Sequence, residues 1–400
     1  MTAHHHHALP SRRGLLTMGA GVSLAYLGGG AAFGQTANTK KKLVVIICRG
    51  AMDDLSVSPP VGDPGYAALR GGLAIKPDTA LKLDSTFGLH PALKATYALA
   101  QDGQARIAPT VAIPERIRSH FEAQDLLESG GARLYGATTG WLNRTLAALG
   151  PTHPMKALSI GPQEPLILRG PIQADSWSPG GRVGASTTRI ATTLQELYKA
   201  DTLLGPALAS GLAVEAQADV LSGGTPLKGN DAKAFAETAA KFLIADGGPS
   251  IAVLNVDGFD THANQGAETG LLAGRLALLD QVIDGLHRGM GAAWSDTVVI
   301  VATEFGRTAR VNGTGGTDHG TASTLILAGG ALKPGGMVGD WPTLAEAKLF
   351  ENRDLAPTLD IRSVFKGVLG DHLEVDRRAL DTKVFPDSGA ATAVQGLVRA

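Results

Sequence analysis

The clearest pattern along the chain is a set of short, largely apolar runs. Four of these runs are rich in β-branched residues and are bounded by glycine or polar residues, at 43–48, 251–256, 297–302 and 324–327. Two weaker runs lie at 105–112 and 157–160. Largely apolar runs of this length are typical of strands that are buried on both faces of a sheet.

Between these runs, apolar residues recur at helical spacing. One face of a helix is indicated by five residues at intervals of 4, 3, 4 and 3: Leu272, Leu276, Leu279, Ile283 and Leu286. Further helices are expected at 90–101, 119–128, 187–199 and 231–245. Ser119 and Glu122 have the spacing of a capping box. Strands that alternate with helices predict a three-layer α/β fold, with a mostly parallel sheet between helices.

The middle of the chain, at about 161–230, departs from this alternation. Glycine, proline and serine cluster at 161–162, 170–171 and 178–181, where they favour turns. We therefore expect one domain over residues 43–400, with an insertion or cap at about 161–230.

The first 34 residues have the pattern of an export signal. Arg12 and Arg13 precede an uncharged stretch at 14–34, and the small residues Ala32 and Gly34 would stand at positions −3 and −1 of a cleavage site. This pattern resembles a twin-arginine signal, although ~20 apolar residues can also span a membrane as an anchor. We expect a signal at 1–34, a linker at 35–42 and a periplasmic or otherwise extracytoplasmic protein that touches the membrane only through its leader.

Charge and cysteine content narrow the possible functions. The chain has 36 basic and 37 acidic residues, for a formal net charge of −1. Nucleic-acid binding needs a basic excess, so we expect no nucleic-acid partner. The single cysteine, Cys48, excludes an intramolecular disulfide and a cysteine-based zinc cluster.

Polar residues that can bind metal or anions stand at the ends of the strong strands. They are Asp53, Asp260, His262, Glu304, Arg307, Asp318 and His319. In open α/β sheets ligands bind beyond the carboxyl ends of the strands, so we expect several of these side chains to meet. Crowded carboxylates are costly to bury unless a cation lies among them. Mixed oxygen and nitrogen ligands predict one or two divalent metal ions, with zinc or manganese favoured.

These loops, in this order, resemble the family called domain of unknown function 1501. That family is placed in the alkaline phosphatase-like superfamily with sulfatases and phosphopentomutases. The segments that carry the resemblance are 49–53 (RGAMD), 118–125 (RSHFEAQD), 260–262 (DTH), 304–308 (EFGRT), 317–320 (TDHG) and 360–364 (DIRSV). The resemblance covers about 43–369 and implies a parallel-rich sheet between helices, with metal above the strand ends.

The resemblance also implies roles for individual residues. It implies metal ligands at Asp53, Asp260, His262, Glu304 and His319. Beside these ligands we expect Asp318 to orient His319. Phe305 stands where the superfamily has a further histidine, which leaves the number of metal ions open.

The candidate catalytic residues are Ser119, His120, Arg118 and Arg307. Ser119 stands at a helix start comparable to that of the superfamily's nucleophile, although serine there also serves as an ordinary helix cap. Either arginine could neutralise an anionic substrate oxygen, or could simply pair with a nearby carboxylate such as Glu304.

Two functions are consistent with these residues. The first is an exported metal-dependent hydrolase of phosphate or sulfate esters, in which the metal activates water or Ser119 to attack a small anionic substrate. The second follows from the missing histidine at Phe305. It is a non-catalytic periplasmic protein that binds a metal or ligand and assembles with another exported protein.

Overall fold

The computed structural model describes residues 40–399, apart from 151–152, 154, 162–163, 179–184, 203 and 222–231. The leader expected at 1–34 and most of the linker expected at 35–42 therefore lie outside the described residues. Among the described residues, no helix combines the length and the apolar character that crossing a membrane requires.

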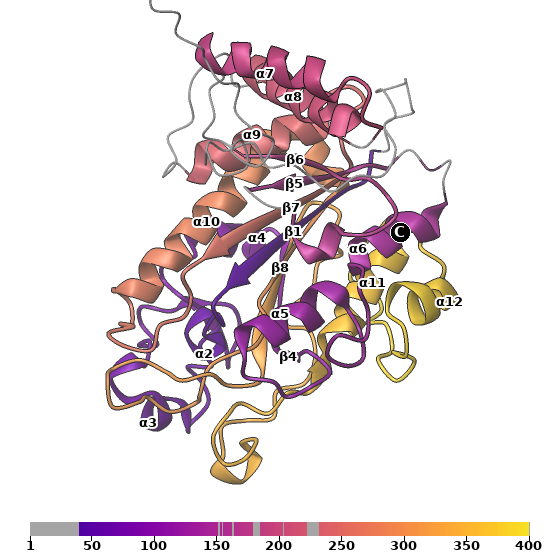
Figure 1. Ribbon diagram of the computed structural model, residues 1–400. Helices are drawn as coiled ribbons and strands as arrows, with labels where there is room; N and C mark the ends of the chain where they lie inside the picture. Colours follow the sequence, from indigo (N-terminus) through magenta and orange to yellow (C-terminus); the bar gives the residue numbers. More distant parts are fainter. Residues whose placement is uncertain are drawn as a thin grey trace, which may run out of the picture.

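A sheet forms the middle layer of the molecule (Figure 1). In the described part of the chain it has eight strands in the order β10-β4-β9-β8-β1-β7-β5-β6. The strands are β1 (Lys42–Arg49), β4 (Ala105–Ala112), β5 (Ala157–Ile160), β6 (Asp175–Trp177), β7 (Ile251–Asp257), β8 (Thr297–Ala302), β9 (Ser323–Ala328) and β10 (Leu359–Asp360). A separate antiparallel pair is formed by β2 (Leu81–Lys82) and β3 (Gly88–Leu89).

The sheet is mostly parallel, as the sequence predicted. β1 pairs in parallel with β7 on one side and with β8 on the other. β9 is the exception, because it runs antiparallel to both β8 and β4. This reversal brings the amino end of β9 to the same edge of the sheet as the carboxyl ends of β1, β7 and β8.

Both faces of the sheet are covered, which confirms the three-layer architecture. Residues 43–48 of β1 are all at most 1% exposed. Alternate side chains of this strand enter two separate apolar cores. Helices α5 (His120–Ser129), α6 (Trp141–Leu149) and α11 (Ile361–Leu373) enclose the core that contains Val45. Helices α4 (Lys94–Gln101), α9 (Ala232–Ile244) and α10 (Leu271–Met290) enclose the core that contains Val44.

The remaining helices are short or lie at the periphery. They are α2 (Asp54–Val57), α3 (Tyr66–Arg70), α7 (Ala185–Tyr198), α8 (Leu204–Leu221) and α12 (Arg377–Ala379), with the short helices η1 (Gly71–Leu73), η2 (Leu166–Leu168), η3 (Gly291–Asp296), η4 (Glu346–Lys348) and η5 (Leu380–Val384). Within the segment expected as an insertion, β6 extends the main sheet by pairing with β5, and α7 and α8 lie beyond that edge (Figure 1).

The structure contains the expected helices, but some of them begin or end at other residues than expected. The five spaced residues of α10 are all buried, as predicted. The helix expected from residue 90 begins only at Lys94, because His90 and Pro91 form a turn in which the Ala92 amide donates to His90 Nδ1. The capping box at Ser119 is wrong: within the part of the chain that the structure describes, the Ser119 side chain makes no capping hydrogen bond.

Candidate metal centre

The candidate site lies at the edge of the sheet where β1, β7 and β8 end. Asp260 and His262 lie in the loop after β7, and His120 is the first residue of α5. His319 precedes β9 and reaches this edge because β9 runs antiparallel to its neighbours. The fold thus brings together residues that are up to about 200 positions apart in sequence.

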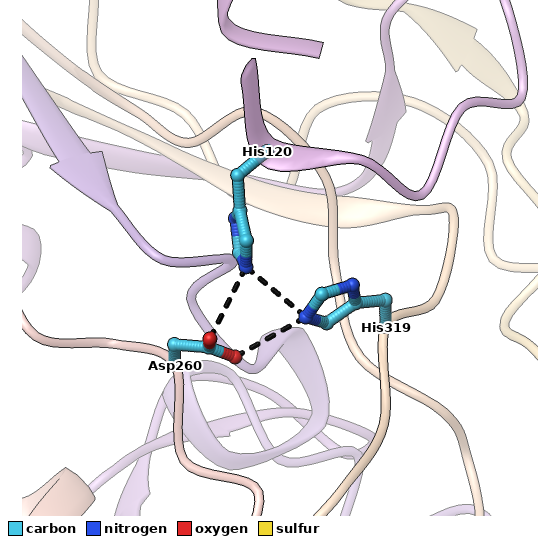
Figure 2. Close-up of side chains that lie close together, drawn as sticks. All are labelled: His120, Asp260 and His319. Atoms are coloured by element: carbon cyan, nitrogen blue, oxygen red, sulfur yellow. Dashed lines mark hydrogen bonds and ion pairs between the residues drawn. The ribbon is translucent and has the colours of Figure 1, made fainter. Parts of the chain in front are cut away.

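Three side chains converge most closely: His120, Asp260 and His319 point toward one another from three separate segments (Figure 2). The Nε2 atoms of His120 and His319 are 3.0 Å apart. Asp260 Oδ2 lies 3.3 Å from His120 Nε2, and Asp260 Oδ1 lies 3.3 Å from His319 Nε2. One potential ligand atom from each residue lies within 4.8 Å of the other two.

His262 lies beside this group. Its Nε2 atom is 2.9 Å from His319 Nε2 and 2.9 Å from Asp260 Oδ1. The structure therefore brings together Asp260, His262 and His319, three of the five residues expected as metal ligands. It adds His120, which we had counted among the catalytic candidates.

The opposite nitrogen of each ring determines what these Nε2 atoms can do. Each Nδ1 faces an acceptor oxygen: His120 at 2.8 Å from Glu304 Oε1, His262 at 3.2 Å from Asp318 Oδ1, and His319 at 2.8 Å from the backbone oxygen of Arg118. An ionised carboxylate and a carbonyl can only accept, so we assign the hydrogen of each neutral ring to Nδ1. Three Nε2 lone pairs and a carboxylate then face one another, an arrangement that a cation stabilises.

The spacing and the ligand types suit a first-row divalent ion. Two ligand atoms at ~2.0–2.1 Å from zinc with a tetrahedral angle lie roughly 3.3 Å apart. The Nε2 atoms of His120 and His319 are 3.0 Å apart, and each lies 3.3 Å from one carboxylate oxygen of Asp260, Oδ2 for His120 and Oδ1 for His319. Imidazole and carboxylate ligands favour zinc or a similar transition metal over calcium, which prefers oxygen alone. His120, Asp260 and His319, with His262 beside them, are thus the residues that would hold the ion.

Electrostatics keep the carboxylate of the centre ionised. Partial burial acts to raise the pKa of Asp260, but the hydrogen bond and charge of Arg307 outweigh it, so the pKa lies below its usual value. The hydrogen bond to Glu304 raises the pKa of His120, whereas burial lowers the pKa of His319. Asp260 is therefore a ready anionic ligand at neutral pH.

Arg307 supports Asp260. The guanidinium is fully buried, and its Nη1 donates to Asp260 Oδ1 at 2.7 Å. Its Nε donates to Thr317 Oγ1 at 3.1 Å and its Nη2 donates to the Thr317 backbone oxygen at 2.6 Å. Of the two expectations for Arg307, the structure shows pairing with a carboxylate, and that carboxylate is Asp260.

Arg118 contacts the centre through its backbone carbonyl oxygen, not through its guanidinium group. Its side chain pairs with Asp354 Oδ2 at 2.7 Å and with Glu351 Oε2 at 2.6 Å. Its carbonyl oxygen accepts the Nδ1 hydrogen of His319. The next residue, Ser119, is half-buried at the start of α5 and is adjacent in the chain to His120.

Glu304 and Asp318 each contact the Nδ1 atom of a histidine of the centre. Glu304 is buried, and its Oε1 accepts from His120 as well as from the Gly50 amide at 2.9 Å and Gln124 Nε2 at 3.2 Å. Asp318 faces Nδ1 of His262, which corrects our expectation that it would orient His319. The backbone oxygen of Arg118 takes that role instead.

Asp53 is not part of the converging group of His120, Asp260 and His319. It is fully buried and pairs with the buried Arg70. It also accepts hydrogen bonds from Ser56 Oγ at 2.8 Å and from Gln265 Nε2. Sequence reasoning placed Asp53 among the metal ligands and did not include Arg70 or Gln265. Arg70 lies 17 positions from Asp53 and Gln265 lies 212 positions from it, and neither carries a motif signal.

Phe305 packs where the resemblance led us to look for a histidine. Its ring is 1% exposed and stacks on His120, with ring centroids 5.0 Å apart and planes at 29°. It also lies 5.1 Å from the ring of His319. An apolar ring thus supports two of the candidate ligands from one side.

The fold and the site together define an α/β protein with a candidate histidine–carboxylate metal centre at the carboxyl edge of its sheet. The family model described as protein of unknown function (DUF1501) matches residues 40–384, so the chain belongs to that family. The sequence matches no curated protein.

Several solved structures are similar over most of the chain. The C-terminal periplasmic domain of EcEptC from Escherichia coli, in complex with Zn, is 9% identical over 73% of this chain and 73% of that chain, with a TM-score of 0.37. BT1596, a 2-O GAG sulfatase, is 10% identical over 74% and 66% of the two chains, with a TM-score of 0.37. A protein in the alkaline phosphatase superfamily from Vibrio parahaemolyticus is 11% identical over 77% and 64%, with a TM-score of 0.33.

Proposed function

We propose that this protein is an exported, metal-dependent hydrolase of phosphate or sulfate esters. One observation carries the proposal: the Nε2 atoms of His120, His262 and His319 meet at Asp260 while each Nδ1 is engaged by an acceptor. Lone pairs that face one another at about 3 Å are unfavourable unless a proton or a metal ion lies between them. Export rests on the twin-arginine pattern at 1–34.

A bound divalent ion supplies Lewis acidity, which acidifies water or a serine hydroxyl and polarises a phosphoryl or sulfuryl oxygen. The residues of this chain hold the centre in shape. Arg307 fixes Asp260, Glu304 fixes His120, and Phe305 packs against the rings of His120 and His319. Supports of this kind orient metal ligands before substrate arrives.

Ser119 is our candidate for the attacking group, with water as the alternative. It directly precedes His120, so the chain places it next to the centre. Its backbone carbonyl accepts from the Ala123 amide in the first turn of α5. The metal would lower the pKa of either nucleophile, and a substitution at Ser119 separates the two.

The test begins with the metal. Full-length protein is produced through its own leader, and its metal content and its hydrolysis of aryl phosphate and aryl sulfate esters are measured. We expect His319→Ala to lose both metal and turnover. His287→Ala, a histidine on α10 outside the centre, should retain both. Equal metal content in wild type and His319→Ala would contradict the proposal.

One observation favours the second candidate, a metal-binding partner protein without turnover. The guanidinium groups of both candidate arginines are engaged within the chain, Arg307 with Asp260 and Thr317, and Arg118 with Asp354 and Glu351. A substrate anion would have to compete with these pairs. Stoichiometric metal without turnover of any phosphate or sulfate ester tested would support this second function.

A further inference from the structure

A chain of buried hydrogen bonds leads from the candidate centre into the interior. Arg307, which holds Asp260, donates through Nε to the Thr317 hydroxyl at 3.1 Å. That hydroxyl donates to Gln265 Oε1 at 2.7 Å, and Gln265 Nε2 donates to Asp53 Oδ2. Arg307, Thr317, Gln265 and Asp53 are all 0% exposed.

The amide of Gln265 has only one favourable orientation in this chain. Its Oε1 accepts from two hydroxyls, Thr317 at 2.7 Å and Thr261 at 2.9 Å. In the flipped orientation an amide oxygen would face the carboxylate oxygen of Asp53, and neither atom could donate. The negative charge of Asp53 therefore sets the direction of each hydrogen bond as far as Thr317.

The negative charge of the buried Asp53 side chain is balanced by groups within the protein. Its Oδ2 atom accepts from the guanidinium of Arg70, from Ser56 Oγ and from Gln265 Nε2. Arg70 is also fully buried, and its Nη1 donates to the Thr308 backbone oxygen at 3.2 Å. A buried carboxylate with a buried guanidinium partner does not need a metal ion for neutralisation.

The opposite end of the chain is much less enclosed. The Asp260 side chain is 42% exposed, so its surroundings alone would leave it free to rotate. The hydrogen bond from Arg307 Nη1 to Asp260 Oδ1 restricts this rotation. The Arg307 guanidinium is itself held in place by Thr317, which accepts hydrogen bonds from its Nε and Nη2.

We infer that Asp53 is the anchoring anion of this network rather than a metal ligand, and that Gln265, Thr317 and Arg307 are positioning residues that hold Asp260 toward the bound cation. The inference rests on the proposed function only in that the centre binds a metal ion.

The test alters the charges of Gln265 and Asp53, the two residues joined by one hydrogen bond of this network. For each variant, the Zn²⁺ affinity of the full chain is measured by competition with a chelating dye. Gln265→Glu places two carboxylates face to face, so we expect affinity to fall by about 10–100-fold, the usual cost of losing support behind a metal ligand. Asp53→Asn keeps an acceptor for Gln265 and should change affinity by less than about 10-fold. The double variant Asp53→Asn/Gln265→Glu restores a donor opposite the carboxylate and should recover most of the loss.

Thermal unfolding checks that each variant folds. If Gln265→Glu does not fold, Thr317→Val and Thr317→Ser test the same link, because only serine keeps the hydroxyl. We then expect the loss with valine and near-normal affinity with serine.

Two results would overturn the inference. Asp53 Oδ1 has no hydrogen-bond partner among the described residues, so ligation by Asp53 is the competing role, and Asp53→Asn would then abolish binding as completely as His319→Ala does. Normal affinity in Gln265→Glu, or equal affinities in the two Thr317 variants, would remove the positioning role. If His319→Ala and Asp260→Asn also bind Zn²⁺ normally, it is the metal proposal itself that fails.

Discussion

His262 Nε2 faces His319 Nε2 at 2.9 Å, although the partner at each Nδ1 leaves neither neutral ring a hydrogen to place between them. Such a contact is tolerable only when a positive charge is present, either as a proton on one ring or as a metal ion. Protons and metal ions must therefore compete at this centre, and the competition can be measured.

The first prediction concerns the pH dependence of Zn²⁺ binding. A histidine must be neutral to bind metal, and the hydrogen bond to Glu304 raises the pKa of His120. Affinity should therefore weaken as pH falls through that raised pKa. Glu304→Gln removes the charge that stabilises protonated His120, so the loss of affinity should move to lower pH. The same titration of the exposed Glu374→Gln is the control, and an unshifted profile in Glu304→Gln would show that His120 does not ligate.

The second prediction concerns Phe305. Its buried ring supports His120 and His319, so Phe305→Ala should create a cavity and cost about 3–5 kcal/mol of unfolding free energy. Phe305→Leu keeps most of the volume and should cost less than about 1.5 kcal/mol. Zn²⁺ affinity should fall more in the alanine variant, because both rings lose a packing partner. Urea unfolding and zinc titration check both effects, and equal affinity in the two variants would argue against a supporting role for this ring.

The third prediction separates structure from chemistry at Ser119. As far as the structure describes its surroundings, the side chain makes no capping hydrogen bond, so Ser119→Ala should change the unfolding free energy by less than about 0.5 kcal/mol. A drop in kcat of this stable variant would then assign Ser119 as nucleophile, whereas unchanged kcat would assign water. A stability loss of about 1 kcal/mol or more would instead show that the hydroxyl caps α5.

Strand patterns predicted much of this architecture from sequence. The four strong runs are strands of the main sheet, and Asp260, His262 and His319 meet because each lies at a strand end on one edge. The antiparallel direction of β9 could not be predicted, since the apolar run at 324–327 carries no information about direction. His319 reaches the site only because of that reversal.

The placement of Asp53 depends on contacts that local patterns do not contain. After β1 the chain turns through positive φ angles at Gly50 and Ala51, of 109° and 61°, and enters α2. Gly50 is required there because a Cβ would lie 2.6 Å from the Asp260 amide nitrogen. The turn leads Asp53 to Arg70 and Gln265, and Gln265 is 212 positions away. A hydrogen bond between residues as far apart in sequence as Asp53 and Gln265 follows only from the completed fold.

The last prediction concerns stability and His372, a buried residue of α11 that lies away from the metal centre. Its Nε2 lies 2.9 Å from the Lys42 backbone oxygen at the start of β1, and burial lowers its pKa to about 4. In the unfolded chain the pKa is about 6.5, so between these values the unfolded state binds more protons than the folded state. The free energy of unfolding should therefore fall as pH decreases, by about 2 kcal/mol between pH 7 and pH 5 from this residue alone.

His372→Gln isolates that contribution, because glutamine offers an N–H donor to Lys42 but does not titrate. Urea unfolding of metal-free protein at pH 7 and pH 5 gives the change for each form. The variant should lose less stability over this range than the wild type, by about the 2 kcal/mol assigned to His372. Equal losses in the two proteins would mean that His372 is protonated in the folded state, and the Lys42 contact would then have to be made by a charged ring.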